Sequence, residues 1–137
     1  MEEKCVVLYE CWQMECCGKP FSKGDTVKWL VLVNGEESLN TPVDLGKIDY
    51  IYEAHSADGS KLFVLEGKVE QIKILYQRYE PLKENSRILA PVSGKTVDAE
   101  TAKGFEPQLG DMSPSDYIVS LEGFTIRAAG KNDVIFK

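Results

Sequence analysis

Short apolar runs that end at turn residues are the pattern that most constrains how this sequence folds. β-branched and aromatic residues that alternate with polar ones, and that stop at Gly, Asn or Asp, are typical of strands. The pattern predicts strands at 5–10, 26–33, 47–54, 61–67, 67–80, 87–92, 116–123, 124–129 and 133–137. Within this set, 47–54 with 61–67 and 124–129 with 133–137 are expected to form hairpins.

The run GKVEQIKILYQRYE at 67–80 also matches helical spacing, through Val69, Ile72 and Tyr76. Its β-branched and aromatic residues favour a long strand instead. The sequence therefore predicts a mainly β fold: a small SH3-like or OB-like β-barrel, or a sandwich, of about seven or eight short strands. A chain of 137 residues is expected to form a single domain over 1–137.

The stretch at 93–115 breaks the strand pattern. It contains two prolines, three glycines and few apolar residues, so we expect one long loop of low stability. Ala99 and Ala102 allow a short helix at 98–103. The loop is interpreted either as a disordered or plain connection or as a lid over a binding site, and its replacement by a short linker is expected to leave the fold intact.

Composition and cysteine content predict a cytoplasmic protein. The chain is 43% hydrophobic and 28% charged, and its apolar runs are much shorter than the roughly 18 residues of a membrane helix. The start, MEEKCVVLYEC, is acidic and has a short apolar run, so no signal peptide and no membrane association are expected. In the cytosol Cys5, Cys11, Cys16 and Cys17 would be thiols.

The net charge of −6 predicts that the chain does not bind nucleic acid, because a phosphate backbone requires a dense basic surface. The charge is unevenly distributed, however: 68–87 has five basic residues, whereas 98–122 is acidic. The simpler interpretation is two solvated surfaces of opposite sign. The alternative is a basic groove that sequesters an anionic small molecule such as a nucleotide.

A dense motif lies at 12–29: Trp12-Gln13, Cys16-Cys17-Gly18, Pro20-Phe21, Gly24-Asp25 and Trp29. It resembles the pattern W-Q-x-x-C-C-G-x-P-F-x-x-G-D-x-V-x-W of a family of small uncharacterised bacterial proteins, a domain of unknown function. Further likeness, at His55, at 67–72 with Tyr76 and Tyr79, and at 117–119, extends the resemblance over about 12–122. Because that family has no established activity, the resemblance bears on the fold more than on the function.

The cysteine stretch has one structural and one metal-binding interpretation. In the structural reading, Gly18 and Pro20 form a turn, Phe21 enters the core and a strand begins after Gly24-Asp25. Adjacent side chains on an extended chain point to opposite sides, so one of Cys16 and Cys17 is expected to be buried and the other exposed. In the metal reading, a zinc site is formed by Cys11, Cys16, Cys17 and His55.

Two further readings involve thiol chemistry. A disulfide between the adjacent Cys16 and Cys17 would be strained and therefore labile. A thiol enzyme would use Cys17 as nucleophile and His55, the only histidine, as base.

The function expected from these observations is a non-enzymatic cytosolic binding or adaptor module for an unknown protein or small molecule. Its site is placed at the loops around 12–25, 55 and 93–115, because small barrels bind ligands at their ends. No cofactor is expected, with zinc as the candidate if there is one, and self-association is an open alternative. The binding residues predicted are Trp12, Cys16, Cys17, His55, Tyr76 and Arg78. A zinc-dependent or thiol-dependent enzyme at Cys16, Cys17 and His55 is the alternative from another class.

Overall fold

The structure is a computed structural model that describes residues 4–16, 18–34, 45–53, 62–81, 83–84 and 87–130, without the side chains of Trp12, Glu15 and Cys16. The described residues form one short helix and eight strands: β1 (Lys4–Glu10), α1 (Cys11–Cys16), β2 (Phe21–Ser22), β3 (Thr26–Val33), β4 (Tyr50–Tyr52), β5 (Phe63–Pro81), β6 (Leu89–Ala99), β7 (Thr101–Ala102) and β8 (Ser113–Ala128). The prediction of a mainly β chain is confirmed.

The larger sheet in the described part of the chain has six strands in the order β3-β4-β1-β8-β5-β6. β3 pairs with β5 as well as with β4, so the pairings lead from β3 through β4, β1, β8 and β5 back to β3. β1 and β4 pair in parallel, whereas the other pairs of this sheet are antiparallel. β2 and β7 form a separate antiparallel pair.

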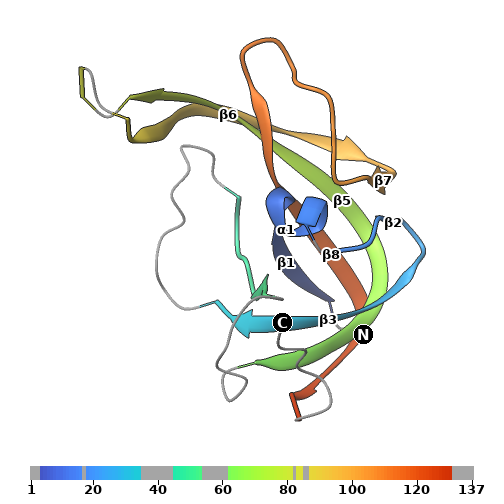
Figure 1. Cartoon of the computed structure of the whole chain (residues 1–137). Coiled ribbons are helices and arrows are strands. Elements are labelled where there is room, and N and C mark those ends of the chain that lie inside the picture. Colours follow the sequence, from blue (N-terminus) through green and yellow to red (C-terminus); the bar gives the residue numbers. More distant parts are fainter. Residues whose placement is uncertain are drawn as a thin grey trace.

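β5 and β8 are two long strands where the sequence predicts four shorter ones. Gly67 lies inside β5, where an added Cβ would be 3.1 Å from the Cβ of Phe124 on β8. Gly123 has a φ of 57° inside β8, and the register between the two strands shifts at three places. Such bulges bend a strand without ending it, and Figure 1 shows both strands curving through the molecule.

The predicted hairpin between 47–54 and 61–67 is wrong. β4 pairs with β1 and β3, whereas residues 63–68 of β5 pair with β3 and β8. Turn residues indicate that the chain reverses, but they do not say which strand becomes the neighbour. The second predicted hairpin includes 133–137, which lies outside the described residues, and it stays a prediction.

The predicted long loop at 93–115 is also wrong. β6 pairs with β5 as far as Ala99, β7 pairs with β2, and β8 begins at Ser113. Only 103–112 connects strands, and the short helix expected at 98–103 is replaced by β-structure. β6 is the end strand of the sheet and has no buried residue, so its sequence lacks the apolar alternation of a strand with one buried face. A linker in place of 93–115 would remove half of β6, so the expected tolerance does not follow.

Helix α1 was not predicted either, because six residues are too few to show helical periodicity. It begins directly after β1, and Cys11 and Met14 are buried against the core. Figure 1 shows α1 in front of β1 and β8, at the centre of the curve that β5 describes. The helix therefore covers one end of the core.

Aromatic rings form the core beside α1. Tyr9 stacks on Tyr52 with ring centroids 3.8 Å apart, and Trp29 approaches Tyr9 edge-on at 5.4 Å. Phe21 and Tyr117 are also buried and contact the same ring of Tyr9. Val31 and Val33 are two residues apart on β3, but Val31 is fully buried whereas Val33 is 57% exposed.

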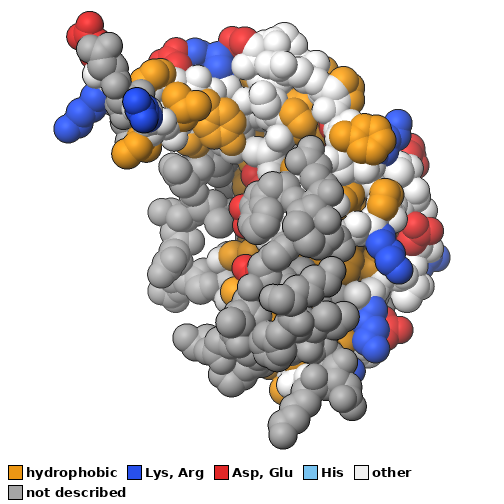
Figure 2. Space-filling model, in the orientation of Figure 1, with side chains coloured by type: hydrophobic (Ala, Val, Ile, Leu, Met, Phe, Trp, Pro, Cys, Tyr) orange, Lys and Arg blue, Asp and Glu red, His pale blue; other side chains and the backbone are white. Residues whose placement is uncertain are grey.

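The end of β5 and its partner β6 project as an arm (Figure 1). Exposed hydrophobic side chains gather on this arm, as Figure 2 shows, and they include Tyr79, Leu89 and Val92. The one helix of the described residues has neither the length nor the apolar composition needed to cross a membrane.

Candidate functional site

Two residues of the cysteine motif hold α1 against the sheet. Gln13 is completely buried, and its Nε2 donates to the carbonyl oxygen of Tyr52 on β4 at 3.1 Å. Beyond the helix, the backbone N–H of Gly18 donates to the carbonyl of Gln13 at 3.0 Å. A Cβ on Gly18 would overlap the phenolic oxygen of Tyr9, so this close approach requires glycine.

The rest of the described motif forms the turn into β3. Phe21 is buried, as the structural reading predicts. Gly24 has a φ of 92°, and Oδ2 of Asp25 accepts a hydrogen bond from the Ser22 N–H at 2.8 Å. The backbone groups of Gly24 and Asp25 exchange hydrogen bonds with Val69 on β5, both at 2.8 Å. The predicted strand start after Gly24-Asp25 is confirmed. The hydrogen bonds of Gly24 and Asp25 fix the start of β3 beside β5.

Cys5 and Cys11 are the two cysteines whose side chains the structure describes, and both are buried. Cys5 is a buried free thiol, and burial raises its pKa to about 12, which makes it a poor nucleophile. Cys11 is buried at the start of α1. Within the described ranges, no three His, Cys, Asp or Glu side chains are grouped so that they could hold a metal ion. The side chain of Cys16 and all of Cys17 and His55 lie outside the described residues, so their roles stay predictions.

The other predicted site residues do not meet in one pocket. The side chain of Trp12 lies outside the description, although its backbone is part of α1. Tyr76 is buried in the main core cluster. Arg78 forms ion pairs with Glu80 and, at 3.5 Å, with Asp111. Neither Tyr76 nor Arg78 lines the two cavities considered below.

A cleft of about 340 Å³ opens where β1 ends and α1 begins, and we call it the α1 cleft. It is built from β1, α1, β5, the 103–112 connection and the first residues of β8. Its lining residues are Glu10, Cys11, Tyr79, Gly104, Glu106, Pro114, Ser115 and Asp116. These described lining residues include three carboxylates and no lysine, arginine or histidine.

Two of the carboxylates face each other across a strand pair. Glu10 on β1 lies opposite Asp116 on β8 in the antiparallel register. Like charges at directly opposite positions destabilise a sheet. Burial raises the pKa of Asp116 from 3.8 to about 6, and repulsion from Glu10 adds to this shift, while a hydrogen bond from Ser115 opposes it. The pair therefore gives the cleft a carboxyl group that titrates close to neutral pH.

Glu106 lines the cleft because the 103–106 segment is hydrogen-bonded to β8. The carboxylate of Glu106 accepts hydrogen bonds from the hydroxyl of Tyr117 and, at 2.9 Å, from the N–H of Lys103. The N–H of Gly104 donates to the same Tyr117 oxygen at 2.8 Å. Burial, together with the hydrogen bond to Glu106, raises the pKa of Tyr117, so this phenol stays a neutral donor.

A buried amide stands behind the wall of the cleft. Gln77 on β5 is 4% exposed, and its Nε2 donates to Ser115 Oγ at 2.9 Å and to the Tyr79 hydroxyl at 3.3 Å. Ser115 and Tyr79 both line the cleft, so these bonds join Gln77 to two residues of its wall, although Gln77 itself does not line it. Oε1 of Gln77 has no hydrogen-bond partner. A buried acceptor left without a donor costs free energy of folding.

A comparison with family models matches residues 3–123 to a family described as "Family of unknown function (DUF6578)". The chain belongs to this family. The matched region contains the cysteine motif, the helix α1 and every residue of the α1 cleft. No curated protein matches the sequence, and no solved structure matches the fold at a significant level. Membership therefore agrees with the resemblance to an uncharacterised family and assigns no activity to the chain.

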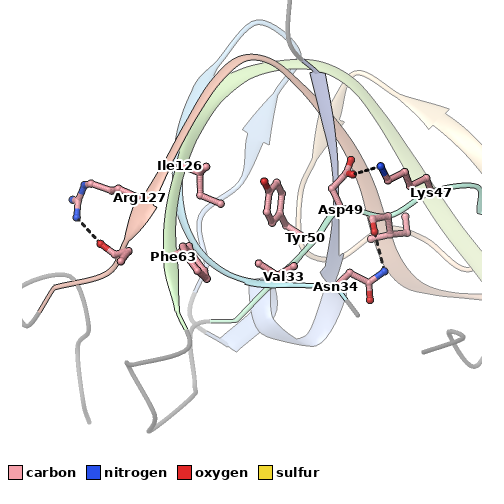
Figure 3. A pocket seen from close by; sticks show the side chains of 10 residues that line it. Val33, Asn34, Lys47, Asp49, Tyr50, Phe63, Ile126 and Arg127 are labelled. Carbon is pink, nitrogen blue, oxygen red and sulfur yellow. Dashed lines mark hydrogen bonds and ion pairs between the residues drawn. The ribbon is translucent and has the colours of Figure 1, made fainter. Parts of the chain in front are cut away.

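A second cavity of this family member lies at the ends of β3 and β8 and has a volume of about 610 Å³; we call it the mouth. Figure 3 shows the side chains of Val33, Tyr50, Phe63 and Ile126 around it, with Arg127 pointing away. Its polar groups already have partners within the protein. Asp49 accepts a hydrogen bond from the Val6 N–H at 2.9 Å and pairs with Lys47 at 3.5 Å, and the amide of Asn34 donates to the Ile48 carbonyl at 2.8 Å.

Sequence reasoning missed the residues that make the α1 cleft acidic. The acids at 98–122 are dispersed along the sequence, yet Glu106 and Asp116 of that stretch line the same cleft. The partner of Asp116 is Glu10, at the far end of the sequence. The available signal was an acid at the end of one predicted strand and an acid at the start of another. It becomes informative only once the two strands are known to pair.

Proposed function

We propose that this chain is a non-enzymatic binding module whose ligand occupies the α1 cleft. One observation carries the proposal: the carboxyl groups of Glu10, Glu106 and Asp116 line one cleft. An acidic pair that faces itself across β1 and β8 weakens the sheet. Asp116 is a desolvated carboxyl group with a raised pKa in a cleft, and such perturbed groups gather at functional sites.

The α1 cleft overlaps part of the binding site that the sequence predicts. Cys11 and Glu10 adjoin the 12–25 motif, and Gly104, Glu106 and Ser115 belong to or adjoin the 93–115 stretch. A volume of about 340 Å³ is at the lower end of the range for small-molecule sites. The mouth is larger, but its described lining has one carboxylate, that of Asp49, which accepts from the Val6 N–H and pairs with Lys47.

Binding is favoured over catalysis because the described lining lacks an activated nucleophile. Cys11 is the one thiol of the described lining. That lining contains no imidazole or amine that could act as a base for this thiol. The zinc-dependent or thiol-dependent enzyme at Cys16, Cys17 and His55 stays an alternative proposal. Zinc analysis of the natively purified protein tests this alternative. One zinc ion per chain that is lost when Cys17 or His55 is substituted would favour that enzyme over the binding module.

We also propose that the module is a small SH3-like or OB-like barrel of a bacterial, cytoplasmic protein, with the W-Q-x-x-C-C-G motif as its signature. The strand pairings that return to β3 support the barrel, and the structural roles of Gln13 and Gly18 support the motif. The acidity of the cleft and the net charge of −6 disfavour the anionic-ligand alternative, and they support the prediction that nucleic acid is not bound.

The proposal is tested by screening small molecules and mapping the hits by ¹H–¹⁵N NMR. We expect hits to shift the amide signals of Gly104, Ser115 and Asp116 and to be weakened by Ser115→Ala. Ile126→Ser, which changes the mouth, is the matched control and should leave binding unchanged. Hits that map to Tyr50 and Ile126 instead, or that are chemically converted during the screen, would refute the proposal.

A further inference from the structure

We propose that the mouth binds an uncharged, apolar small molecule. This second site goes beyond the proposed function, because none of its described lining residues lines the α1 cleft. The inference follows from the direction of four apolar side chains, from the exposure of two of them, and from the charges around the cavity.

On one side of the mouth, the end of β3 and the start of β4 carry the apolar face of the core beyond the core itself. Val33 is two residues after the fully buried Val31, so the two side chains lie on the same face of β3. Tyr50 lies directly opposite Val33 in the antiparallel pair of β3 and β4, which places its ring on this face too. Although it belongs to the core face, Val33 is 57% exposed.

On the other side of the mouth, the start of β5 and the end of β8 have the same arrangement. Phe63 is two residues before the fully buried Leu65, and Ile126 lies directly opposite Leu65 on β8. The three side chains therefore share one face. Phe63 packs against the core cluster, whereas Ile126 is 37% exposed.

Two strand pairs thus direct apolar side chains into one cavity. Figure 3 shows Val33, Tyr50, Phe63 and Ile126 around it. Single exposed apolar side chains are common on protein surfaces, but a group of them around a hollow marks a binding site, because a ligand removes their apolar surface from water. The volume of about 610 Å³ is within the roughly 300–1,000 Å³ of small-molecule sites.

The charges around the mouth favour an uncharged ligand. Lys47 and Asp49 pair with each other at 3.5 Å, so their charges offset one another. Figure 3 shows Arg127 pointing away from the cavity, and its guanidinium donates to the Ala128 carbonyl at 3.4 Å. The charged groups of the described lining are therefore not directed at a ligand, and burial of apolar surface has to supply the affinity.

The extent of the mouth favours a small molecule over a second copy of the chain. Ten described residues line it, whereas a stable protein–protein interface involves about 20–30 residues on each side. The lining is also hollowed rather than flat, which suits a ligand that enters the cavity.

Three probes of similar size test the class of ligand: toluene, benzoate and benzylammonium, each titrated into the ¹⁵N-labelled protein at pH 7.5. We expect toluene to shift the amide signals of Tyr50, Phe63 and Ile126 in a saturable manner. The two ions should bind at least fivefold more weakly. An ion that binds as tightly as toluene would overturn the uncharged class, and if toluene does not shift these signals, the inference is wrong.

Two variants test the residues. Val33→Ser and Ile126→Ser should each weaken toluene binding at least threefold, because each removes apolar surface from the mouth. Val92→Ser is the matched control, because Val92 is 41% exposed on β6 but does not line the mouth. Unchanged affinity in both mouth variants would contradict the proposal. Dispersed NMR spectra establish that each variant is folded, and if one is not, the other decides.

Sedimentation equilibrium tests the alternative that a second copy covers the mouth. We expect the parent protein and Val33→Ser to have the same mass in solution. A parent that dimerises and a Val33→Ser variant that does not would overturn the small molecule in favour of self-association.

The proposed function is tested separately, because toluene should leave the signals of Gly104, Ser115 and Asp116 in the α1 cleft unchanged. Screening hits confined to the mouth would refute the α1 cleft as the ligand site and support this inference. Hits confined to the α1 cleft, with no binding of toluene at the mouth, would uphold the proposed function and overturn this inference.

Discussion

Gly18 lies so close to Tyr9 that an added Cβ would overlap the phenolic oxygen of Tyr9. The same Cβ would be 3.0 Å from the Cα of Met14 in α1. The glycine of the cysteine motif is therefore a contact point between the end of the helix, the helix backbone and the aromatic core. Its role is steric, and it can be tested without any ligand.

Gly18→Ala is expected to destabilise the protein by about 1–3 kcal/mol, the usual range for overpacking a core. Removing the hydroxyl with Tyr9→Phe should relieve part of the clash, so the double variant should lose less stability than the sum of the two single variants. Urea unfolding of the four proteins measures this coupling. Strictly additive losses would mean that Tyr9 is not the group that excludes a side chain at Gly18.

Gln13→Met should destabilise the protein by about 1–3 kcal/mol, because the fully buried amide of Gln13 donates to the carbonyl of Tyr52. The substitution keeps the length of the side chain and leaves the buried carbonyl without this donor. Gln108→Met, at an exposed position of the 103–112 connection, is the control and should be nearly neutral. Equal melting temperatures for the two variants would contradict the role assigned to Gln13.

Phe21→Ala and Phe105→Ala should have very different effects. Phe21 is buried among aromatic rings, so its truncation is expected to cost about 3–5 kcal/mol. Phe105 is 76% exposed in the 103–112 connection, and its truncation should change stability by less than about 0.5 kcal/mol. Denaturant unfolding measures both. A large loss with Phe105→Ala would show that the connection is anchored by this ring.

Asp116 is expected to make the folded protein less stable as pH rises. Burial, with repulsion from Glu10, raises its folded-state pKa to about 6 from the ordinary 3.8, so the folded protein retains a proton that the unfolded chain loses. The resulting penalty develops between about pH 4 and pH 6 and is complete above pH 6. The other titratable groups that line the cleft around Asp116 are Cys11, Tyr79 and Glu106.

Asp116→Asn should therefore stabilise the protein at pH 7.5, by on the order of 1–2 kcal/mol, and the gain should disappear near pH 4. Thermal unfolding at a series of pH values measures the difference between variant and parent. Asp98→Asn, at an exposed position on β6, is the control. A difference between Asp116→Asn and its parent that does not vary with pH would show that the carboxyl of Asp116 is not desolvated.

Strand positions could largely be predicted because alternation is a local property. The runs at 5–10 and 26–33 coincide with β1 and β3, and 67–80 lies within β5. The predictions failed where the same local sequence pattern is compatible with two different structures. Gly67 and Gly123 indicated strand ends but lie at bends within long strands. The 93–115 stretch has the composition of a loop, yet residues 93–99 belong to the end strand β6, whose main-chain pairing with β5 needs no apolar pattern.

The sequence by itself determined which segments extend, where the chain turns, and that Phe21 and the residues after Gly24-Asp25 belong to the core and the next strand. These features depend on neighbours within a few residues, so the physical causes are visible in the sequence. Only the tertiary structure decided that β1 pairs with β8, which places Glu10 opposite Asp116, and that the connection at 103–112 carries Glu106 to the same cleft. Pairing between distant strands depends on the burial of side chains from the whole chain at once, and no local pattern records it.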